Sequence, residues 1–287
     1  MKVSRSIERV TAPNGGPFTG NGTNSYVVRR GQSCVVIDPG PDDETHLAAI
    51  LGAAAGCPIA HILVTHAHRD HVDGVARLKA LTGATTVGFG RLARPKPGAD
   101  PSQSPSSGDF VDWAFMPDRV VTDGEVITLP GFELVAVHTP GHAPDHLCFA
   151  LTSTPYLFSG DHVMGWSTSV IAPPEGHMGD YLASLEKLIA RSEAEYLPGH
   201  GDAIPDGPRQ ARAYLIHRQM REQAVLGVIR QGTATVQSVT DSVYAELAAN
   251  LANAARLSVI AHVELLAEKG LVAADRPLQA NTQLRAT

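Results

Sequence analysis

Short apolar runs alternate with longer amphipathic segments over the first two hundred residues. The runs have the length and composition of strands. They lie at 25–30, 33–38, 61–65, 85–89, 125–129, 132–138, 146–151, 156–159 and 195–200. The amphipathic segments have the periodicity of helices, and they lie at 43–56, 71–83 and 179–192. This alternation predicts an α/β domain.

Two of these segments make more specific predictions. The strands at 25–30 and 33–38 flank Gly31 and Gln32, and this spacing predicts a β-hairpin. In the helix predicted over 71–83, four apolar residues share one face: Val72, Val75, Leu78 and Leu81.

The pattern changes after residues 204–208, which read Ile-Pro-Asp-Gly-Pro and predict a linker. Beyond the linker come three helical segments and a short apolar run, an order typical of a winged-helix or helix-turn-helix module. The helical segments lie at 211–232, 238–248 and 253–275. The sequence therefore predicts a main domain over 1–205 and a small helical domain over 209–280, with the final dozen residues as a tail.

One further segment, Pro95–Asp109, is rich in proline, serine and glycine. Such a composition favours a flexible surface loop over a lid, because no residue type in it points to a role at a site.

The composition limits the classes of function that the chain can have. The whole chain carries a net charge of −6, which argues against a general polyanion binder. The part from Arg209 onward has nine Lys and Arg against six Asp and Glu, a mild basicity that is weak evidence for nucleic-acid binding. The three scattered cysteines, Cys34, Cys57 and Cys148, argue against a disulfide framework. No apolar stretch has the length of a membrane span or a signal-peptide core, so we expect a cytoplasmic protein.

The thirteen histidines give the first positive evidence of function. Residues 65–71 read Thr-His-Ala-His-Arg-Asp-His, directly after an apolar strand and before a helix. Two histidines separated by one residue can converge on one ion, and the following Asp and His can face a second ion. A histidine-rich surface loop is the alternative, but this density at a strand-to-helix turn is typical of a metal site.

Three later strands end in further candidate ligands. His142 follows the strand at 132–138, Asp161 follows the strand at 156–159, and His200 closes the strand at 195–200. A glycine stands beside each of them, and glycine lets the backbone bend close to a site. The four segments in this order are far more specific than any one alone.

In these residues the sequence resembles the metallo-beta-lactamase-fold hydrolases, whose pattern is HxHxDH, then His, then a bridging Asp, then His. The resemblance implies an αββα sandwich of two sheets with helices outside, and a site for two divalent ions. It implies that a first ion is held by His66, His68 and His142. It implies a second ion held by Asp70, His71 and His200, with Asp161 bridging the two. It also implies that Asp38 is an outer partner of a ligand.

Two ions ~3.5–4 Å apart can share one water and lower its pKa toward neutrality. The resulting hydroxide would attack a carbonyl carbon or a phosphorus atom. Imidazole and carboxylate ligands suit Zn²⁺, and they leave Mn²⁺ and Fe²⁺ open. We expect two catalytic carboxylates, with Asp161 as the bridge and Asp70 orienting the water and taking its proton.

Other residues have two interpretations each. His146 faces the substrate or is a structural histidine, with equal support. Arg218 and Arg221, three apart on one predicted helix, either contact the substrate's phosphates or make interdomain salt bridges, which we slightly favour. We expect a structural role for His138, and we expect His162 to point away from the site.

Several further segments resemble the lactamase-beta-2-like subfamily, whose members carry an appended winged helix and include an endoribonuclease of single-stranded RNA. They are residues 20–26, 160–166 and 217–222. A binuclear hydrolase that cleaves a phosphodiester of single-stranded RNA is therefore our first expectation. A thioesterase or lactonase of the glyoxalase II type, acting on a small ester or thioester, is the main alternative.

Three other possibilities are weaker. A non-catalytic winged-helix regulator that binds nucleic acid would be expected to have lost at least one ligand. The bridging Asp161 disfavours a true beta-lactamase, and His68 disfavours a flavodiiron-type oxidoreductase, which has an acidic residue there. A homodimer is left open.

Overall fold

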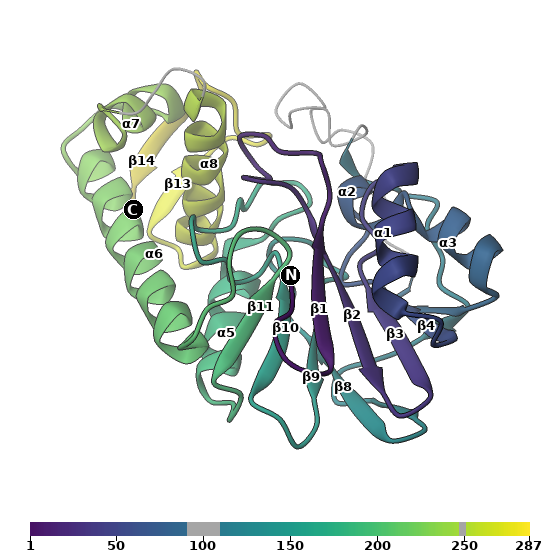
Figure 1. Ribbon diagram of the computed structural model, residues 1–287. Helices are drawn as coiled ribbons and strands as arrows, with labels where there is room; N and C mark the ends of the chain where they lie inside the picture. Colours follow the sequence, from purple (N-terminus) through teal and green to yellow (C-terminus); the bar gives the residue numbers. More distant parts are fainter. Residues whose placement is uncertain (91–109, 247–250) are drawn as a thin grey trace.

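The computed structural model describes residues 1–90, 110–246 and 251–287. Two β-sheets pack face to face, helices cover their outer faces, and a smaller helical unit lies at one side (Figure 1). The predicted loop at Pro95–Asp109 lies outside the described residues. Within them, every helix is too short or too polar to cross a bilayer.

The first sheet has six strands in chain order. Its first three strands are antiparallel, and the hairpin predicted around Gly31 and Gln32 is confirmed. From the third strand onward the pairing is parallel. The strands are β1 (Ile7–Thr11), β2 (Asn24–Arg30), β3 (Ser33–Ile37), β4 (Ile59–Leu63), β5 (Thr85–Gly88) and β6 (Arg119–Val120).

The second sheet has five strands in the order β11-β10-β9-β8-β7, with only the β10–β11 pair parallel. Apolar residues on the facing sides of the two sheets form the core, among them Val28, Leu63 and Phe149. Burial of such side chains supplies the main stabilising free energy. The strands are β7 (Val126–Leu129), β8 (Phe132–His138), β9 (Leu147–Leu151), β10 (Tyr156–Gly160) and β11 (Glu195–Pro198).

Helices cover both outer faces. On the first sheet, α1 (Glu44–Ala54), α2 (Arg69–Val72) and α3 (Val75–Thr82) share a core with its strands. On the second sheet, α5 (Met178–Ile189) does the same. The predicted αββα sandwich is confirmed.

The helix predicted over 71–83 is wrong in one respect, because the chain forms two helices there. They meet at Gly74, where a Cβ atom would lie only 3.1 Å from each of three backbone oxygens of residues 39–41. The helical face predicted to be shared also ends early, since Leu81 is 60% exposed. In the first sheet, the sequence pattern also missed the two edge strands, β1 and β6.

In its described residues, the smaller unit contains three helices and a three-stranded sheet, and the predicted winged helix is confirmed. The helices are α6 (Gly207–Arg230), α7 (Val236–Val243) and α8 (Ala252–Glu268). The sheet has the order β12 (Ala234–Thr235), β14 (Gln283–Ala286) and β13 (Val272–Ala274). The predicted tail is wrong, because β14 pairs with both other strands beyond residue 280.

The two units share packed residues rather than a free linker. Ile204, in the predicted linker, is buried and exchanges backbone hydrogen bonds with Tyr196 of β11. Tyr214 of α6 and Leu265 of α8 belong to the same apolar cluster as Leu185 of α5. The winged-helix unit is therefore attached to the outer face of the second sheet.

Candidate metal centre

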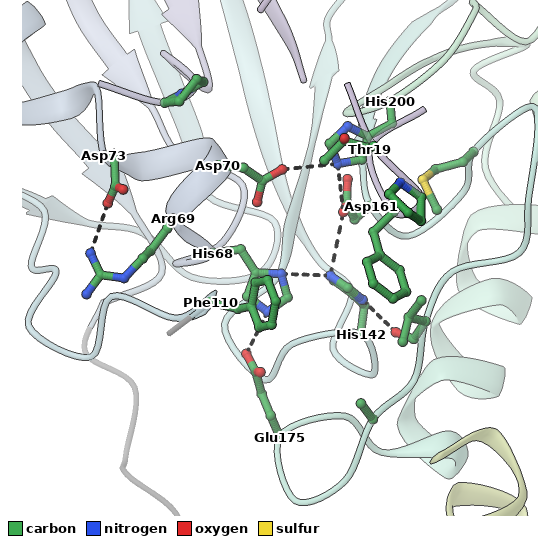
Figure 2. Close-up of a pocket in the computed structure, with 17 residues that line it drawn as sticks. Thr19, His68, Arg69, Asp70, Asp73, Phe110, His142, Asp161, Glu175 and His200 are labelled. Atoms are coloured by element: carbon green, nitrogen blue, oxygen red, sulfur yellow. Dashed lines mark hydrogen bonds and ion pairs between the residues drawn. The ribbon is translucent and has the colours of Figure 1, made fainter. Parts of the chain in front are cut away.

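The four predicted ligand segments meet at one edge of the sandwich, because each follows the carboxyl end of a core strand. They follow β4, β8, β10 and β11. Figure 2 shows that their side chains converge from both sheets on one pocket. The structure therefore brings together all seven residues predicted to bind metal: His66, His68, Asp70, His71, His142, Asp161 and His200.

The first group contains His66, His68, His142 and Asp161, whose potential ligand atoms all lie within 4.8 Å of one another. His68 Nδ1 is 2.9 Å from His66 Nε2 and 3.1 Å from His142 Nε2. Asp161 Oδ2 lies 3.7 Å from His142 Nε2. Three ring nitrogens and a carboxylate thus surround one point.

The second group contains Asp70, His71 and His200, again within 4.8 Å of one another. Asp70 Oδ2 is 3.4 Å from His71 Nε2 and 3.3 Å from His200 Nε2. Asp161 also faces this group, with Oδ1 3.4 Å from His71 Nε2 and Oδ2 3.3 Å from His200 Nε2. The carboxylate of Asp161 therefore lies between the two groups, where a bridging ligand would be.

Outer partners determine which ring nitrogens carry lone pairs. His142 Nδ1 donates to the backbone oxygen of Val170 at 2.7 Å, and His68 Nε2 donates to Glu175 Oε1 at 3.1 Å. His71 Nδ1 donates to Asp38 Oδ2 at 2.8 Å, which confirms the outer-partner role predicted for Asp38. In neutral rings the inward nitrogens are then left as acceptors.

The same arrangement holds for the other two histidines. His66 Nδ1 lies 2.9 Å from Thr65 Oγ1, whose hydroxyl also lies 2.8 Å from Asp38 Oδ2 and can donate to it. His200 Nδ1 faces the backbone oxygen of Gly22 at 3.3 Å. In their neutral forms, all five histidines therefore aim a lone pair inward.

These residues fit a pair of cations. Lone pairs facing one another at 2.9–3.1 Å repel unless a positive charge lies between them. His71 Nε2 and Asp161 Oδ1 are also buried with no hydrogen-bond partner in the described parts of the chain, which is costly for polar atoms. The two clusters are thus consistent with a binuclear metal centre, and nitrogen and oxygen ligands are those of first-row divalent ions.

Ionisation of the site is mixed in the absence of metal. Burial opposes the charge of three histidines, but nearby carboxylates outweigh it: they raise the pKa of His68 to about 9, that of His200 to about 10 and that of His71 well above the ordinary value. Metal binding would release these protons. Burial opposes the charge of Asp161, but His200 and His71 outweigh burial and hold its pKa well below the ordinary value. Burial, with His71 and His68 nearby, lowers the pKa of His66 well below its ordinary value. Asp161 is therefore ionised and His66 neutral at neutral pH, the forms in which both residues bind metal.

A glycine makes the bridge possible. Gly199 lies just before His200, and a Cβ atom there would be 2.4 Å from Asp161 Oδ1 and 2.8 Å from His71 Cε1. Real Cβ atoms do not approach so closely, so any other residue would displace one of these side chains.

The centre opens into a pocket of about 440 Å³. His68, Asp70, His142, Asp161 and His200 are exposed to it, together with Arg69 and Glu175 (Figure 2). Its other walls are mostly apolar: Pro17, Phe18, Pro41, Phe110, Met164, Val170 and Ala172. The pocket therefore offers a large apolar surface beside the potential metal ligands.

The structure does not bring His146 to this pocket. Its ring is fully buried, with Nδ1 2.9 Å from Thr139 Oγ1 and Nε2 accepting from the backbone N–H of Asp161 at 3.1 Å. This position agrees with the structural alternative, since His146 supports the turn that carries Asp161. His162, which we expected to point away from the site, belongs to neither ligand group, and its ring packs against Tyr181. His138 forms no hydrogen bond with the described ligand residues, and its Nε2 lies 2.9 Å from the backbone oxygen of Pro144.

Arg218 and Arg221 also lie outside the pocket lining. Arg218 is buried and donates to the backbone oxygen of Ser169. Arg221 donates to the backbone oxygen of Val243 at 2.8 Å and stacks over the ring of Tyr244. Within the described part of the chain, neither forms the interdomain salt bridge that we favoured, and both donate to backbone oxygens instead.

Glu175 is the functional residue that the sequence did not reveal. It lies in the loop before α5, 107 residues from His68, and no recognisable motif surrounds it. Only its carboxylate and its position four residues before the helix predicted over 179–192 could have drawn attention to it.

Known proteins show the same organisation. Residues 18–200 match the family described as "Metallo-beta-lactamase superfamily", and residues 235–277 match "Beta-lactamase associated winged helix domain". The chain is 29% identical over 273 residues to "Beta-lactamase-like protein 2 homolog" of Caenorhabditis elegans, covering 93% of this chain and 85% of that protein. It is 31% identical over 246 residues to "Atrochrysone carboxyl ACP thioesterase AgnL7" of Paecilomyces divaricatus, covering 84% and 71%.

The fold also matches a solved structure, that of "a Beta-lactamase domain protein from Burkholderia ambifaria", with a TM-score of 0.81 at 18% identity. The match covers all of this chain and 93% of the other. The sequence match over the sandwich, the winged helix and the paired clusters of ligand residues agree, and the chain belongs to the metallo-beta-lactamase superfamily of hydrolases.

Proposed function

We propose that this hydrolase is a thioesterase acting on thioesters whose acyl group is bulky and apolar. The observation that carries the proposal is the pocket, where Phe18, Phe110 and Met164 stand beside the ligand clusters. An aromatic or branched acyl group would bury its surface against them and bring its carbonyl carbon to the centre. The similarity to a protein described as an acyl-carrier-protein thioesterase supports the same reaction class.

A phosphodiester of RNA fits this surface less well. Holding an RNA strand needs several cations along its path. Arg69 is the one Lys or Arg among the described residues lining the pocket, and it already pairs with Asp73 at 3.3 Å. Arg218 and Arg221, for which contact with the substrate's phosphates was one of two interpretations, donate to backbone oxygens. The regulator hypothesis is also weakened, because all seven ligand residues are present.

The protein's own groups would act as follows. When bound, a pair of divalent ions supplies Lewis acidity and makes a water a better nucleophile. Thr23 Oγ1 donates to Asp70 Oδ2 at 2.9 Å, which fixes the carboxylate at the pocket wall. Asp70 would orient the water and accept its proton at a carboxylate oxygen. The apolar walls exclude bulk water and orient the acyl group. We further propose zinc as the ion, on the basis of the imidazole and carboxylate ligands.

The test compares two substrates that differ only in the acyl group. We would incubate metal-loaded protein with the benzoyl and acetyl thioesters of N-acetylcysteamine and measure release of the thiol. Burial of the ring should raise kcat/KM for the benzoyl substrate by about tenfold or more. Phe18→Ala should reduce this preference, whereas Met116→Ala, at a 56% exposed residue outside the pocket lining, should not.

A labelled single-stranded RNA serves as the competing substrate in the same preparation. Thioester hydrolysis that disappears in His142→Ala, without RNA cleavage, supports the proposal. Metal-dependent RNA cleavage without thioester hydrolysis would overturn it.

A further inference from the structure

One loop connects the metal centre to the winged-helix unit. It follows Asp161 and contributes Met164, Val170 and Ala172 to the pocket wall. It also supports two ligands, because the backbone oxygen of Val170 accepts from His142 Nδ1 at 2.7 Å. Ser169 Oγ lies 2.5 Å from the backbone oxygen of Asp161. A shift of this loop would therefore move ligands of the first group.

Helix α6 holds the same loop from outside. The hydroxyl of Tyr214 is within hydrogen-bonding reach of the backbone oxygens of Met164 and Ser167. One turn further along, Arg218 Nη2 donates to the backbone oxygen of Ser169. Residues four apart lie on one face of a helix, so both side chains reach the loop together.

Arg218 is itself fixed from several sides. It is only 4% exposed, its Nη1 is 3.4 Å from Ser258 Oγ of α8, and its guanidinium lies 5.6 Å from the centre of the Tyr181 ring. Among the described residues, no carboxylate lies within ion-pair distance of it. Burial of an unpaired cation is costly. Its contact with Ser169 accounts for the retention of a charge there, since a charged donor binds a carbonyl oxygen more strongly than a neutral one does.

We propose that Tyr214 and Arg218 are positioning residues of the metal centre. They act on His142 and Asp161 through the loop described above, residues 163–172. The winged-helix unit is then a structural part of the hydrolytic site. This inference concerns the centre alone, so it does not depend on which ester is hydrolysed.

The test measures metal binding in the full chain. Protein stripped of metal would be titrated calorimetrically with Zn²⁺, as wild type, as Arg218→Met and as Tyr214→Phe. His142→Ala and His200→Ala would identify which binding step belongs to which group. Loss of an outer support typically lowers metal affinity ~10–100-fold. We expect that loss at the His66, His68 and His142 group in Arg218→Met, a smaller loss at the other group, and partial recovery in Arg218→Lys.

The control is Lys269→Met. Lys269 Nζ pairs at 2.7 Å with Glu222, a buried residue of α6, so this variant removes a cation that contacts the same helix but does not touch the loop. It should lose thermal stability and keep both affinities. If Arg218→Met does not fold, Tyr214→Phe decides, since it removes only a hydroxyl. The proposal would be overturned if the folded Arg218 and Tyr214 variants had wild-type metal affinities. An equal loss of affinity in Lys269→Met would also overturn it.

Because the measured quantity is metal affinity, the outcome is separate from that of the thioesterase proposal. A protein that hydrolyses no thioester can still show the selective loss of affinity. If the protein is a thioesterase but its Arg218 and Tyr214 variants bind both ions normally, the positioning role of these two residues is wrong.

Discussion

The histidines of the metal centre are buried or partly buried, and two other histidines, His162 and His262, are fully buried, but the two sets differ in their surroundings. Each histidine of the centre has its outer nitrogen held by a protein group, such as Asp38 beside His71. The rings of His162 and His262 are fully buried, and neither nitrogen of either ring has a hydrogen-bond partner among the residues that the structure describes. His162 packs against aromatic rings, and His262 lies in α8 of the winged-helix unit.

This difference shows that burial does not make a histidine a potential ligand. An outer acceptor fixes the proton on one nitrogen and leaves a lone pair on the other, aimed at the ion. Without that acceptor the ring is a polar group in an apolar setting, and it costs stability. The comparison predicts different consequences for mutations in the two sets.

The largest effect is expected for Asp161→Ala. This change removes the carboxylate that faces both groups, so the loss of metal affinity should exceed the ~10–100-fold typical of an outer partner. Metal content measured by elemental analysis after dialysis should fall below two equivalents. Asp202→Ala, at a carboxylate that is 91% exposed, should retain two. Two full equivalents in Asp161→Ala would contradict the bridging role.

A smaller effect is expected for Asp38→Asn. The carboxylate of Asp38 accepts from His71 Nδ1, from Thr65 Oγ1 and from the backbone N–H of Thr65. An amide in its place presents an N–H₂ group to one of these donors, so metal affinity should fall by about 10–100-fold. Calorimetric titration with Zn²⁺ would measure the change.

The matched control is Asp43→Asn, at the N-cap of α1, where asparagine caps as well as aspartate does. Equal affinities in the Asp38 and Asp43 variants would show that the outer partner does not matter.

The smallest effect, and one of opposite sign, is expected for His262→Leu. Burial, with Arg218 and Arg221 nearby, lowers the pKa of His262 to about 3. Below pH 6.5 this histidine binds a proton in the unfolded chain but not in the folded one. It therefore lowers the free energy of unfolding as the pH falls. The cost is up to about 1.4 kcal/mol per pH unit between the two pKa values.

Leucine removes this term, so the variant should gain stability relative to wild type as the pH falls from 7 to 5. Urea unfolding at both pH values would measure the gain. A stability difference that is the same at pH 7 and pH 5 would show that His262 is not held neutral by the fold.

The sequence predicted the metal centre better than its surroundings, for a physical reason. The ligands follow the ends of core strands, and neighbouring strands bring their ends together in any such sandwich. Glu175 and Val170 meet His68 and His142 only through the path of an irregular loop, which no local pattern encodes. The interruption at Gly74 was missed because helical periodicity does not reveal where backbone crowding breaks a helix. Leu81 was misassigned because periodicity does not reveal where a helical face leaves the core, and Leu81 lies in the last turn of α3.

The close approach at Gly199 bears on how relatives of this protein are classified. A homologue can keep every histidine and aspartate of the centre and still be inactive, if its residue at this position carries a side chain. A survey that counts only the ligands would include such a protein among the enzymes. For genome annotation, this glycine is thus as informative as the metal-ligand residues that pack against it.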